Sequence, residues 1–382
     1  MGLEPKLREA IDRAVASGME IGLQVAVYRG DELIADAWAG HADAARTRLV
    51  DGDTLFTVFS ATKAPAALAV HIQAERGLLD YDQPVAHYWP EFGQHGKEAT
   101  TVRDALLHRS GVPQMPLGTT PEQMCDWEGM CVAVAALEPL WKPGTKSGYH
   151  AYTFGWIMGE LVRRTDPKHR PFAQWVQDEI CAPLGIRDLW LGIPEAVESR
   201  IAEIIDLPPA SLAAIPENSP LRLAIPFALN TGTATFGRLD VRRSCHPGAG
   251  GIMNARSLAR MYACLASGGK LDGARLVSAA RVDAMRRCYT DEVDAVIGTP
   301  YRRGLGFWLG GQPPGSDLMG PNPGAFGHPG AGGAIGWCDP EAGVSVALLK
   351  NRMLAPAQQI AQGQDEHQPK CGGGVASVDQ AS

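Results

Sequence analysis

The predicted fold is decided by the stretch Leu55-Phe56-Thr57-Val58-Phe59-Ser60-Ala61-Thr62-Lys63-Ala64-Pro65, which opens a long apolar run. Residues 64–72 are nearly all apolar, which is typical of a helix buried at the centre of a protein. Ser60 and Lys63 stand three residues apart at the expected helix start, so their Cβ atoms lie on one face, roughly 5–6 Å apart. A partly desolvated lysine this close to a hydroxyl can lose its own proton and accept that of the serine. The stretch therefore predicts a serine nucleophile with a lysine beside it.

A second serine and lysine with the same spacing, Ser267 and Lys270, enclose two glycines. Paired glycines are typical of a helix end followed by a turn, not of a rigid helix face. We therefore expect a helix C-terminus at this position and assign the nucleophile to Ser60.

The composition places the chain among ordinary globular proteins. Its 382 residues can form one large core or two domains, and 45% hydrophobic with 20% charged residues is a usual balance. The net charge of −7 argues against nucleic acid and anionic membrane surfaces as partners. The first residues lack an apolar signal region and no apolar stretch approaches a membrane span, so we expect a cytoplasmic protein.

The cysteines and histidines give no support for a metal site or a cofactor. Eight cysteines are scattered without Cys-x-x-Cys pairs, which is typical of reduced, buried thiols. Ten histidines show no His-Glu-x-x-His or similar spacing. We expect a protein that needs neither metal nor cofactor.

The residue periodicity predicts a mixed α/β protein with antiparallel strands. A helix is expected at 3–17, followed by a hairpin with strands at 23–28 and 33–38. We expect further helices at 101–111, 121–137, 152–164, 171–180 and 258–266, and three strands of one sheet at 304–309, 333–337 and 344–349. The proline-rich segment 193–248 predicts a loop-rich wall, which either lines an acyl pocket or is a plain surface insertion.

A second candidate catalytic motif is the segment 141–152, where Pro143-Gly144-Thr145 predicts a turn that precedes Tyr149. A phenol has an ordinary pKa near 10, so Tyr149 needs the nearby positive charge of Lys63 to act as a base. The alternative is that Tyr149 is a packing aromatic, and Tyr152 is the rival candidate base.

The third candidate motif is the segment 326–333, in which His328 lies among glycines just before a predicted strand. Glycines there let a substrate lie against exposed strand backbone. His328 is a candidate for binding a substrate carbonyl or carboxylate, or for assisting proton transfer. The alternative is a histidine in a glycine-rich hairpin with no such role.

The three motifs occur in the order Ser-x-x-Lys, Pro-Gly-Thr-x₃-Tyr, His-x-Gly. This order resembles the class C β-lactamase superfamily, and most closely its esterase branch, the family VIII carboxylesterases. Three further segments, 106–112, 248–253 and 351–353, resemble segments of the same family. The similarity covers about residues 5–355.

The resemblance implies a role for each motif. Ser60 would be the acylated nucleophile, Lys63 would lower its pKa and move the proton, and Tyr149 would be the general base. The backbone N–H groups of Ser60 and Ala331 would form the oxyanion hole. The substrate contacts expected on this basis are His328, Gly330, His150 and Tyr152.

The resemblance also implies a fold of the β-lactamase and penicillin-binding-protein type, an antiparallel sheet flanked by helices with a mostly helical domain across the cleft. The expected domains are 1–75 with 240–361 for the sheet, 76–239 for the helical domain, and 362–382 as a disordered tail.

The chain departs from the family in two motifs. Tyr-x-Asn reads Tyr149-His150-Ala151, so the amide that helps to hold a lactam is missing. Lys-Thr-Gly reads His328-Pro329-Gly330, so the cation that attracts a β-lactam carboxylate is replaced by a weaker one. Both departures resemble the esterase branch and count against a dedicated β-lactamase. The family's final helix is also short here, about 355–361.

The leading hypothesis is a serine carboxylesterase that hydrolyses small or short-chain esters through an acyl-enzyme. An acyltransferase with the same acyl-enzyme is the runner-up, followed by a weak β-lactamase or D-amino-acid peptidase. A non-catalytic binding relative is the weakest alternative, because the serine, lysine and tyrosine are all present. The expected partner is a small-molecule ester, and the oligomeric state stays open.

Overall fold

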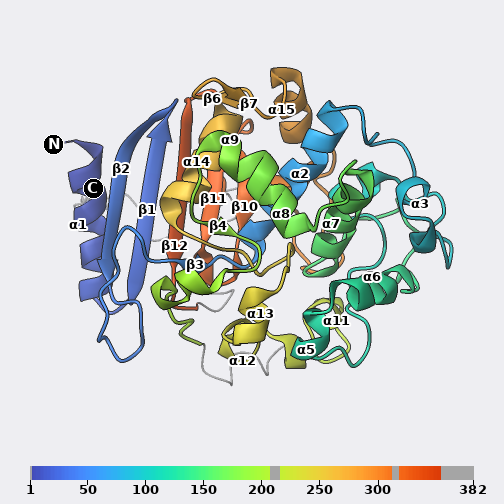
Figure 1. The fold of residues 1–382 in the computed structure, drawn as a ribbon, viewed down its shortest axis with the longest axis horizontal. Coiled ribbons are helices and arrows are strands. Elements are labelled where there is room, and N and C mark those ends of the chain that lie inside the picture. The colour runs from blue at the N-terminus through green and yellow to red at the C-terminus, as the bar shows by residue number, and fades with distance from the viewer. Residues whose placement is uncertain (1, 207–215, 312–317, 354–382) are drawn as a thin grey trace, which may run out of the picture.

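The computed structural model describes residues 2–206, 216–311 and 318–353, and its centre is a seven-stranded antiparallel sheet (Figure 1). The strand order is β2-β1-β12-β11-β10-β9-β8, so the N-terminal hairpin lies beside the last strand of the chain. The strands are β1 Gly22–Arg29, β2 Glu32–Gly40, β8 Arg303–Gly304, β9 Phe307–Leu309, β10 Phe326–Pro329, β11 Ile335–Asp339 and β12 Val344–Lys350.

Both faces of this sheet are covered by helices, because alternate residues of a strand point to opposite faces. On β12, Val346 and Leu348 pack with the apolar face of α1 (Leu3–Ala16). Ala347 and Leu349 belong to the main core on the other face, where α14 (Ala255–Ala266) contacts β12. Figure 1 shows α1 on one side of the sheet and α14 on the other. The predicted fold class, an antiparallel sheet flanked by helices, is confirmed.

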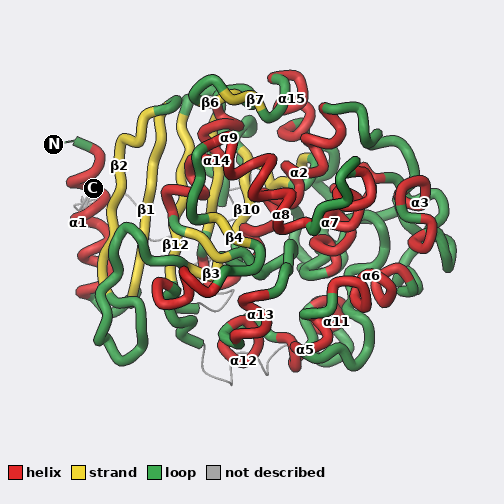
Figure 2. The backbone as a smooth tube through the Cα atoms, viewed as in Figure 1, coloured by secondary structure: helices red, strands yellow, loops and turns green. Residues whose placement is uncertain are grey.

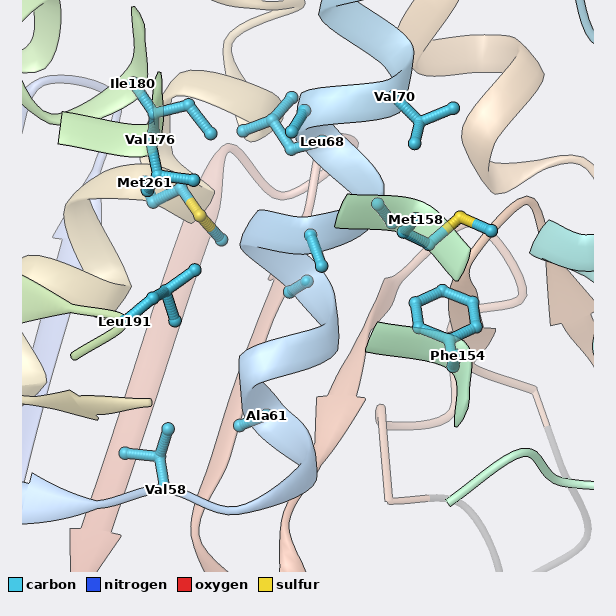
Figure 3. Close-up of a cluster of buried hydrophobic side chains, with 14 of the residues drawn as sticks. Val58, Ala61, Leu68, Val70, Phe154, Met158, Val176, Ile180, Leu191 and Met261 are labelled. Carbon is cyan, nitrogen blue, oxygen red and sulfur yellow. The ribbon is translucent and has the colours of Figure 1, made fainter. Parts of the chain in front are cut away.

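Helix α2 (Lys63–Glu75) is the centre of the main core, as its apolar run predicts. Every residue of α2 except Glu75 is buried. Figure 3 shows Phe154 and Met158 on one side of α2, and Val176 and Ile180 on another. Burial of each large apolar side chain stabilises the fold by about 1.5–3 kcal/mol, so α2 is held rigidly.

The remaining helices are mostly short and are joined by long loops (Figure 2). They are α3 Val85–Tyr88, α4 Val102–Leu106, α5 Pro121–Met124, α6 Trp127–Ala135, α7 Thr153–Thr165, α8 Phe172–Val176, α9 Ala182–Leu184, α11 Pro220–Ala224, α12 Thr233–Phe236, α13 Leu239–Arg243 and α15 Ala279–Arg286. A small three-stranded sheet has the order β3-β5-β4, with β3 Phe56–Thr57, β5 Ile252–Met253 and β4 Leu189–Trp190, and β6 Lys270–Leu271 pairs with β7 Ala274–Arg275.

Three predicted helices end earlier or divide. The predicted helix 121–137 is two helices, because Asp126 caps α6 by accepting the Gly129 N–H at 3.1 Å. The predicted helix 101–111 does start at the Thr101 cap but ends at Leu106, and His108 adopts a positive φ of 58°. The predicted helix 171–180 is α8 followed by a single π-helical turn at Gln177–Cys181.

The C-terminal strands also differ from the prediction. The single strand expected at 304–309 is the hairpin β8–β9, which turns at Gly306 with φ 80°. The segment 326–329, expected to precede a strand, is itself strand β10. The strands expected at 333–337 and 344–349 are β11 and β12.

The second Ser-x-x-Lys match is a helix end, as predicted. Ser267 is the C-cap of α14, and Gly268 and Gly269 follow with φ of 67° and 81°. Lys270 then begins β6.

The structure places the seven strands of the large sheet within 22–40 and 303–350. The domain boundaries themselves stay a prediction. The expected short helix 355–361 and the tail 362–382 lie outside the described residues.

Candidate active site

Ser60 lies where the chain leaves β3 and enters the central helix. The preceding residue, Phe59, has φ 45° and ψ −129°, a conformation that costs a non-glycine residue of order 1–3 kcal/mol. Ser60 then opens a 3-10 turn, Ser60–Thr62, that runs directly into α2. Thr62 fixes this turn, because its hydroxyl donates to the Phe59 carbonyl and accepts the Gly251 N–H at 2.8 Å. The result is a half-buried serine at the start of the buried helix α2.

Lys63 is fully buried next to Ser60. Its Nζ lies 3.1 Å from Ser60 Oγ and donates to the carbonyl oxygens of Ala151 and Gly248, both at 2.7 Å. Burial lowers the pKa of Lys63 well below its ordinary value of 10.5. A neutral amine has two N–H groups and one lone pair, and the two carbonyls take both N–H groups. In the neutral form of Lys63 the lone pair is therefore left for the proton of Ser60, and in the protonated form the third N–H donates to Ser60 Oγ.

Tyr149 completes the group of three. Its phenol interacts with the Ser60 side chain, and Lys63 Nζ lies 4.8 Å from the centre of its ring. Burial raises the pKa of Tyr149 above its ordinary value, and the Ser60 side chain opposes this shift. The backbone N–H of Tyr149 donates to Asp294 Oδ1 at 3.1 Å. The structure thus brings Tyr149 to Ser60 and Lys63, although Tyr149 is far from both in the sequence.

The rival candidate Tyr152 points elsewhere. Its hydroxyl donates to the Leu229 carbonyl oxygen at 2.6 Å, and burial raises its pKa. It is the N-cap residue of α7, and its side chain is buried. The phenol is engaged as a donor, so the geometry does not support Tyr152 as the base or as a substrate contact.

His150 is a structural residue in this geometry and not the substrate contact that was expected. Its Nδ1 bonds the Gly148 carbonyl oxygen at 2.6 Å, and its Nε2 accepts the Val112 N–H at 3.2 Å and bonds the Ser110 hydroxyl at 2.8 Å. The residue is 1% exposed, and burial lowers its pKa to about 4. Both ring nitrogens are occupied, so none is left for a substrate.

His328 lies at the end of β10, with its ring centre 6.1 Å from that of Tyr149. Its Nδ1 bonds the Pro329 carbonyl oxygen at 2.7 Å, which requires the proton on Nδ1. Burial holds the pKa of His328 well below 6.5, so the ring is neutral. Its Nε2 is buried and has no partner among the described residues. A neutral ring in this tautomer presents an acceptor at Nε2, which suits a hydroxyl or water proton and not a carboxylate.

Gly330 allows β10 to approach the nucleophile closely. A Cβ at this position would overlap the carbonyl oxygen of Val58, two residues before Ser60. The next residue, Ala331, opens a short turn in which the Gly333 N–H donates to the Gly330 carbonyl oxygen at 3.1 Å. The backbone N–H groups of Ser60 and Ala331 donate to no other described residue. Two free donors on contacting segments are what an oxyanion hole needs.

Two further buried residues belong to this region and were missed in the sequence. Asp294 and Arg303 form an ion pair of 2.7 Å beside Tyr149, and both are at most 1% exposed. They lie in 290–303, a segment without a motif or clear periodicity, so no sequence signal indicates them.

Comparison with known proteins assigns the class. The fold and the Ser-x-x-Lys helix start define a β-lactamase and penicillin-binding-protein type of serine hydrolase. A family model described as Beta-lactamase matches residues 7–367, and the chain belongs to this family. The resemblance to the β-lactamase superfamily, predicted from the three sequence motifs, is confirmed.

The similar proteins include named esterases. The Esterase/beta-lactamase LipL of Mycobacterium tuberculosis is 37% identical over 345 residues, covering 88% of this chain and 78% of LipL. Esterase EstB of Burkholderia gladioli is 28% identical over 268 residues, covering 62% of this chain and 68% of EstB. The crystal structure of a family VIII carboxylesterase superposes with a TM-score of 0.84 at 34% identity, covering 95% of this chain and 96% of the other.

The described residues offer neither a metal-binding cluster nor a membrane-spanning helix. Within them, no group of three or more histidine, cysteine, aspartate or glutamate side chains is placed to hold a metal ion. None of the helices at 2–206, 216–311 or 318–353 is long and apolar enough to cross a membrane.

Proposed function

We propose that the chain is a serine carboxylesterase that hydrolyses small or short-chain esters through an acyl-enzyme on Ser60. The observation that carries this proposal is the hydrogen bonding of Lys63. Two of its N–H groups are held by the Ala151 and Gly248 carbonyls, and Nζ lies 3.1 Å from Ser60 Oγ, so in the neutral amine the lone pair is left for Ser60. An esterase-type activity agrees with the named relatives LipL and EstB.

In the proposed acylation step, Lys63 accepts the proton of Ser60 while Oγ attacks the ester carbonyl. The backbone N–H groups of Ser60 and Ala331 stabilise the oxyanion. Tyr149, beside Ser60 and the resulting Lys63 ammonium, gives its phenol proton to the leaving alkoxide and takes one proton back from Lys63. In deacylation the same groups remove a proton from water, and the ring of His328, 6.1 Å from that of Tyr149, offers its Nε2 as an acceptor for this water.

The charges around the site support an uncharged substrate. Lys63 is held by Ser60 and two carbonyls, and Arg303 is paired with Asp294. His328 is neutral, so it offers no cation to the carboxylate of a β-lactam. These features favour simple esters over β-lactams. Acyl transfer and a cytoplasmic location stay predictions.

The substrate class is tested with p-nitrophenyl acetate, butyrate and octanoate, with the β-lactam nitrocefin alongside. We expect kcat/KM for the best ester to exceed that for nitrocefin by roughly 100-fold or more, since a missing charged contact costs about 2–3 kcal/mol. The order among the three esters measures the length of acyl chain that the site accepts. Nitrocefin turnover equal to or faster than ester turnover would contradict the proposed substrate class.

The role of Tyr149 is tested by a matched pair of substitutions, Tyr149→Phe and Tyr152→Phe. Each removes one buried phenol oxygen and keeps the ring. We expect Tyr149→Phe to lower kcat/KM for p-nitrophenyl butyrate by roughly 10²–10⁴-fold, the usual effect of losing a general acid–base group. Tyr152→Phe loses only the bond to Leu229 and should keep activity within about threefold per folded molecule. The reverse order would transfer the role to Tyr152.

A further inference from the structure

The carboxylate of Asp294 is a single anchor for two segments of backbone. Its Oδ1 accepts the N–H of Tyr149 at 3.1 Å, and those of Val296 and Ile297 at 2.8 and 2.7 Å. Two of these bonds fold the segment 294–297 onto the carboxylate, and the third reaches across to Tyr149. Asp294 is fully buried, so water does not compete for these bonds.

Arg303 holds Asp294 from the other side. Its Nη2 lies 2.7 Å from Asp294 Oδ2, and its Nη1 donates to Ser147 Oγ at 2.6 Å. Ser147 in turn donates to the Leu107 carbonyl oxygen at 2.9 Å. Because Arg303 begins β8, the pair connects the edge of the large sheet to the segment that carries Tyr149.

Aromatic packing places the same pair next to the reacting groups. The Arg303 guanidinium lies 5.9 Å from the centre of the Trp308 ring, and that ring is 6.2 Å from the ring of Tyr149. The Tyr149 ring in turn lies 4.8 Å from Lys63 Nζ. A displacement of Asp294 or Arg303 therefore changes the distance between the Tyr149 phenol and Ser60.

Stability alone is a weak reason for such a pair. Two charges lose their hydration when they are buried, and apolar replacements of similar volume are often neutral or stabilising. The buried pair does, however, fix geometry, because Oδ1 of Asp294 accepts three N–H groups while Oδ2 is ion-paired with Arg303. Its position directly behind Tyr149 gives that rigidity a use.

We propose that Asp294 and Arg303 are positioning residues that hold Tyr149 at the distance from Ser60 and Lys63 that proton transfer requires. This inference rests on the proposed function, since it assigns Tyr149 a part in the reaction. Both side chains are buried. Both act through the backbone of Tyr149 and through Ser147.

A second buried carboxylate provides a matched control. Glu160, on α7, has a fully buried side chain and bonds Arg163 at 2.8 Å, Arg164 at 2.6 Å and Trp127 Nε1 at 3.0 Å. These bonds join α7 to α6 and involve none of the three reacting residues. Glu160→Gln therefore reproduces the loss of a buried, arginine-paired charge without a change at Tyr149.

The test compares Asp294→Asn, Asp294→Ala and Glu160→Gln with the wild type. A fluorophosphonate probe, which bonds covalently to an activated serine, gives both the number of competent Ser60 sites and the rate at which they react. Ester hydrolysis is then expressed per labelled site, so unfolded protein does not count. Melting temperatures are measured on the same samples.

We expect Asp294→Ala to slow labelling and ester hydrolysis per site by roughly 100-fold, because a misplacement of about 1 Å costs this much. Asp294→Asn keeps an oxygen that can accept the Tyr149 N–H, so its loss should be smaller, roughly tenfold. Glu160→Gln should lower the melting temperature and leave both rates within about twofold. If the single variants fail to fold, Asp294→Asn with Arg303→Gln removes both charges together and should show a loss of roughly tenfold.

Equal rates per labelled site in the wild type and in the Asp294 variants would overturn the positioning role and leave the proposed function intact. An equal loss in Glu160→Gln would also overturn it, because the effect would then be general destabilisation. A wild type that neither labels at Ser60 nor hydrolyses esters would overturn the proposed function, and the positioning role with it.

Discussion

Replacement of Ser60 by alanine is expected to lower kcat/KM for p-nitrophenyl butyrate by roughly 10⁴–10⁶-fold, the range seen when a serine hydrolase loses its nucleophile. The hydroxyl is hydrogen-bonded to Lys63 and lies beside Tyr149 at the start of the buried helix α2, and the proposed acyl-enzyme forms on this oxygen. Without it no covalent intermediate can form. The residual rate should be that of the oxyanion donors and binding alone.

The matched control for this change is Ser267→Ala in the second Ser-x-x-Lys segment. Ser267 is exposed and caps α14, so its removal should leave ester turnover within about twofold. The measurement is initial-rate hydrolysis at equal concentrations of folded protein, with circular dichroism as the check on folding. Turnover that survives in Ser60→Ala would mean that the ester reacts at another site.

The central helix and the nucleophile could be predicted from the sequence because their signals are local. An apolar run of nine residues predicts a buried helix without reference to the rest of the chain. A spacing of three residues likewise predicts which side chains share a helix face. The glycine pair at 268–269 likewise identifies the false match without reference to the rest of the chain. The N-terminal hairpin is also read correctly, because its turn and alternation are contained in 23–38.

The tautomers of His328 and His150, and which of their ring nitrogens stay free, could not be predicted from the sequence. They depend on which carbonyl oxygen lies opposite each ring. His328 and His150 both read as available polar groups in the sequence. In the structure the Pro329 and Gly148 carbonyls fix the proton on Nδ1 of each, and Val112 with Ser110 then occupies Nε2 of His150 alone. One histidine keeps an acceptor near the site and the other does not.

Contacts between residues far apart in the sequence could not be predicted either. Asp294 and Tyr149 are 145 residues apart, and Lys63 and Gly248 are 185 apart. Neither pair has a spacing that a local rule can detect. The hairpin at β8–β9 was missed for a related reason, since the pairing of such short strands is set by neighbours such as β10.

Replacement of Lys63 is the prediction that most directly tests how the nucleophile is activated. Lys63→Met and Lys63→Arg should each lower kcat/KM by roughly 10²–10⁴-fold, the usual effect of removing a positioned general base. Methionine is similar in length but has no lone pair of comparable basicity. Arginine keeps the positive charge but cannot lose its proton in a protein. If the charge of Lys63 were what mattered, Lys63→Arg would retain activity, and this outcome would contradict the base assignment.

The dependence of the wild-type rate on pH gives the same assignment an independent test. Burial lowers the pKa of Lys63, so the neutral amine becomes the main form at a lower pH than for an exposed lysine. We therefore expect kcat/KM to rise with pH as Lys63 loses its proton, and to level off well below pH 10.5. A rate that continues to rise up to pH 10.5 would mean that Lys63 is protonated at neutral pH. Lys270→Met, at the exposed second match, should leave this profile unchanged, because Lys270 lies in the surface hairpin β6–β7.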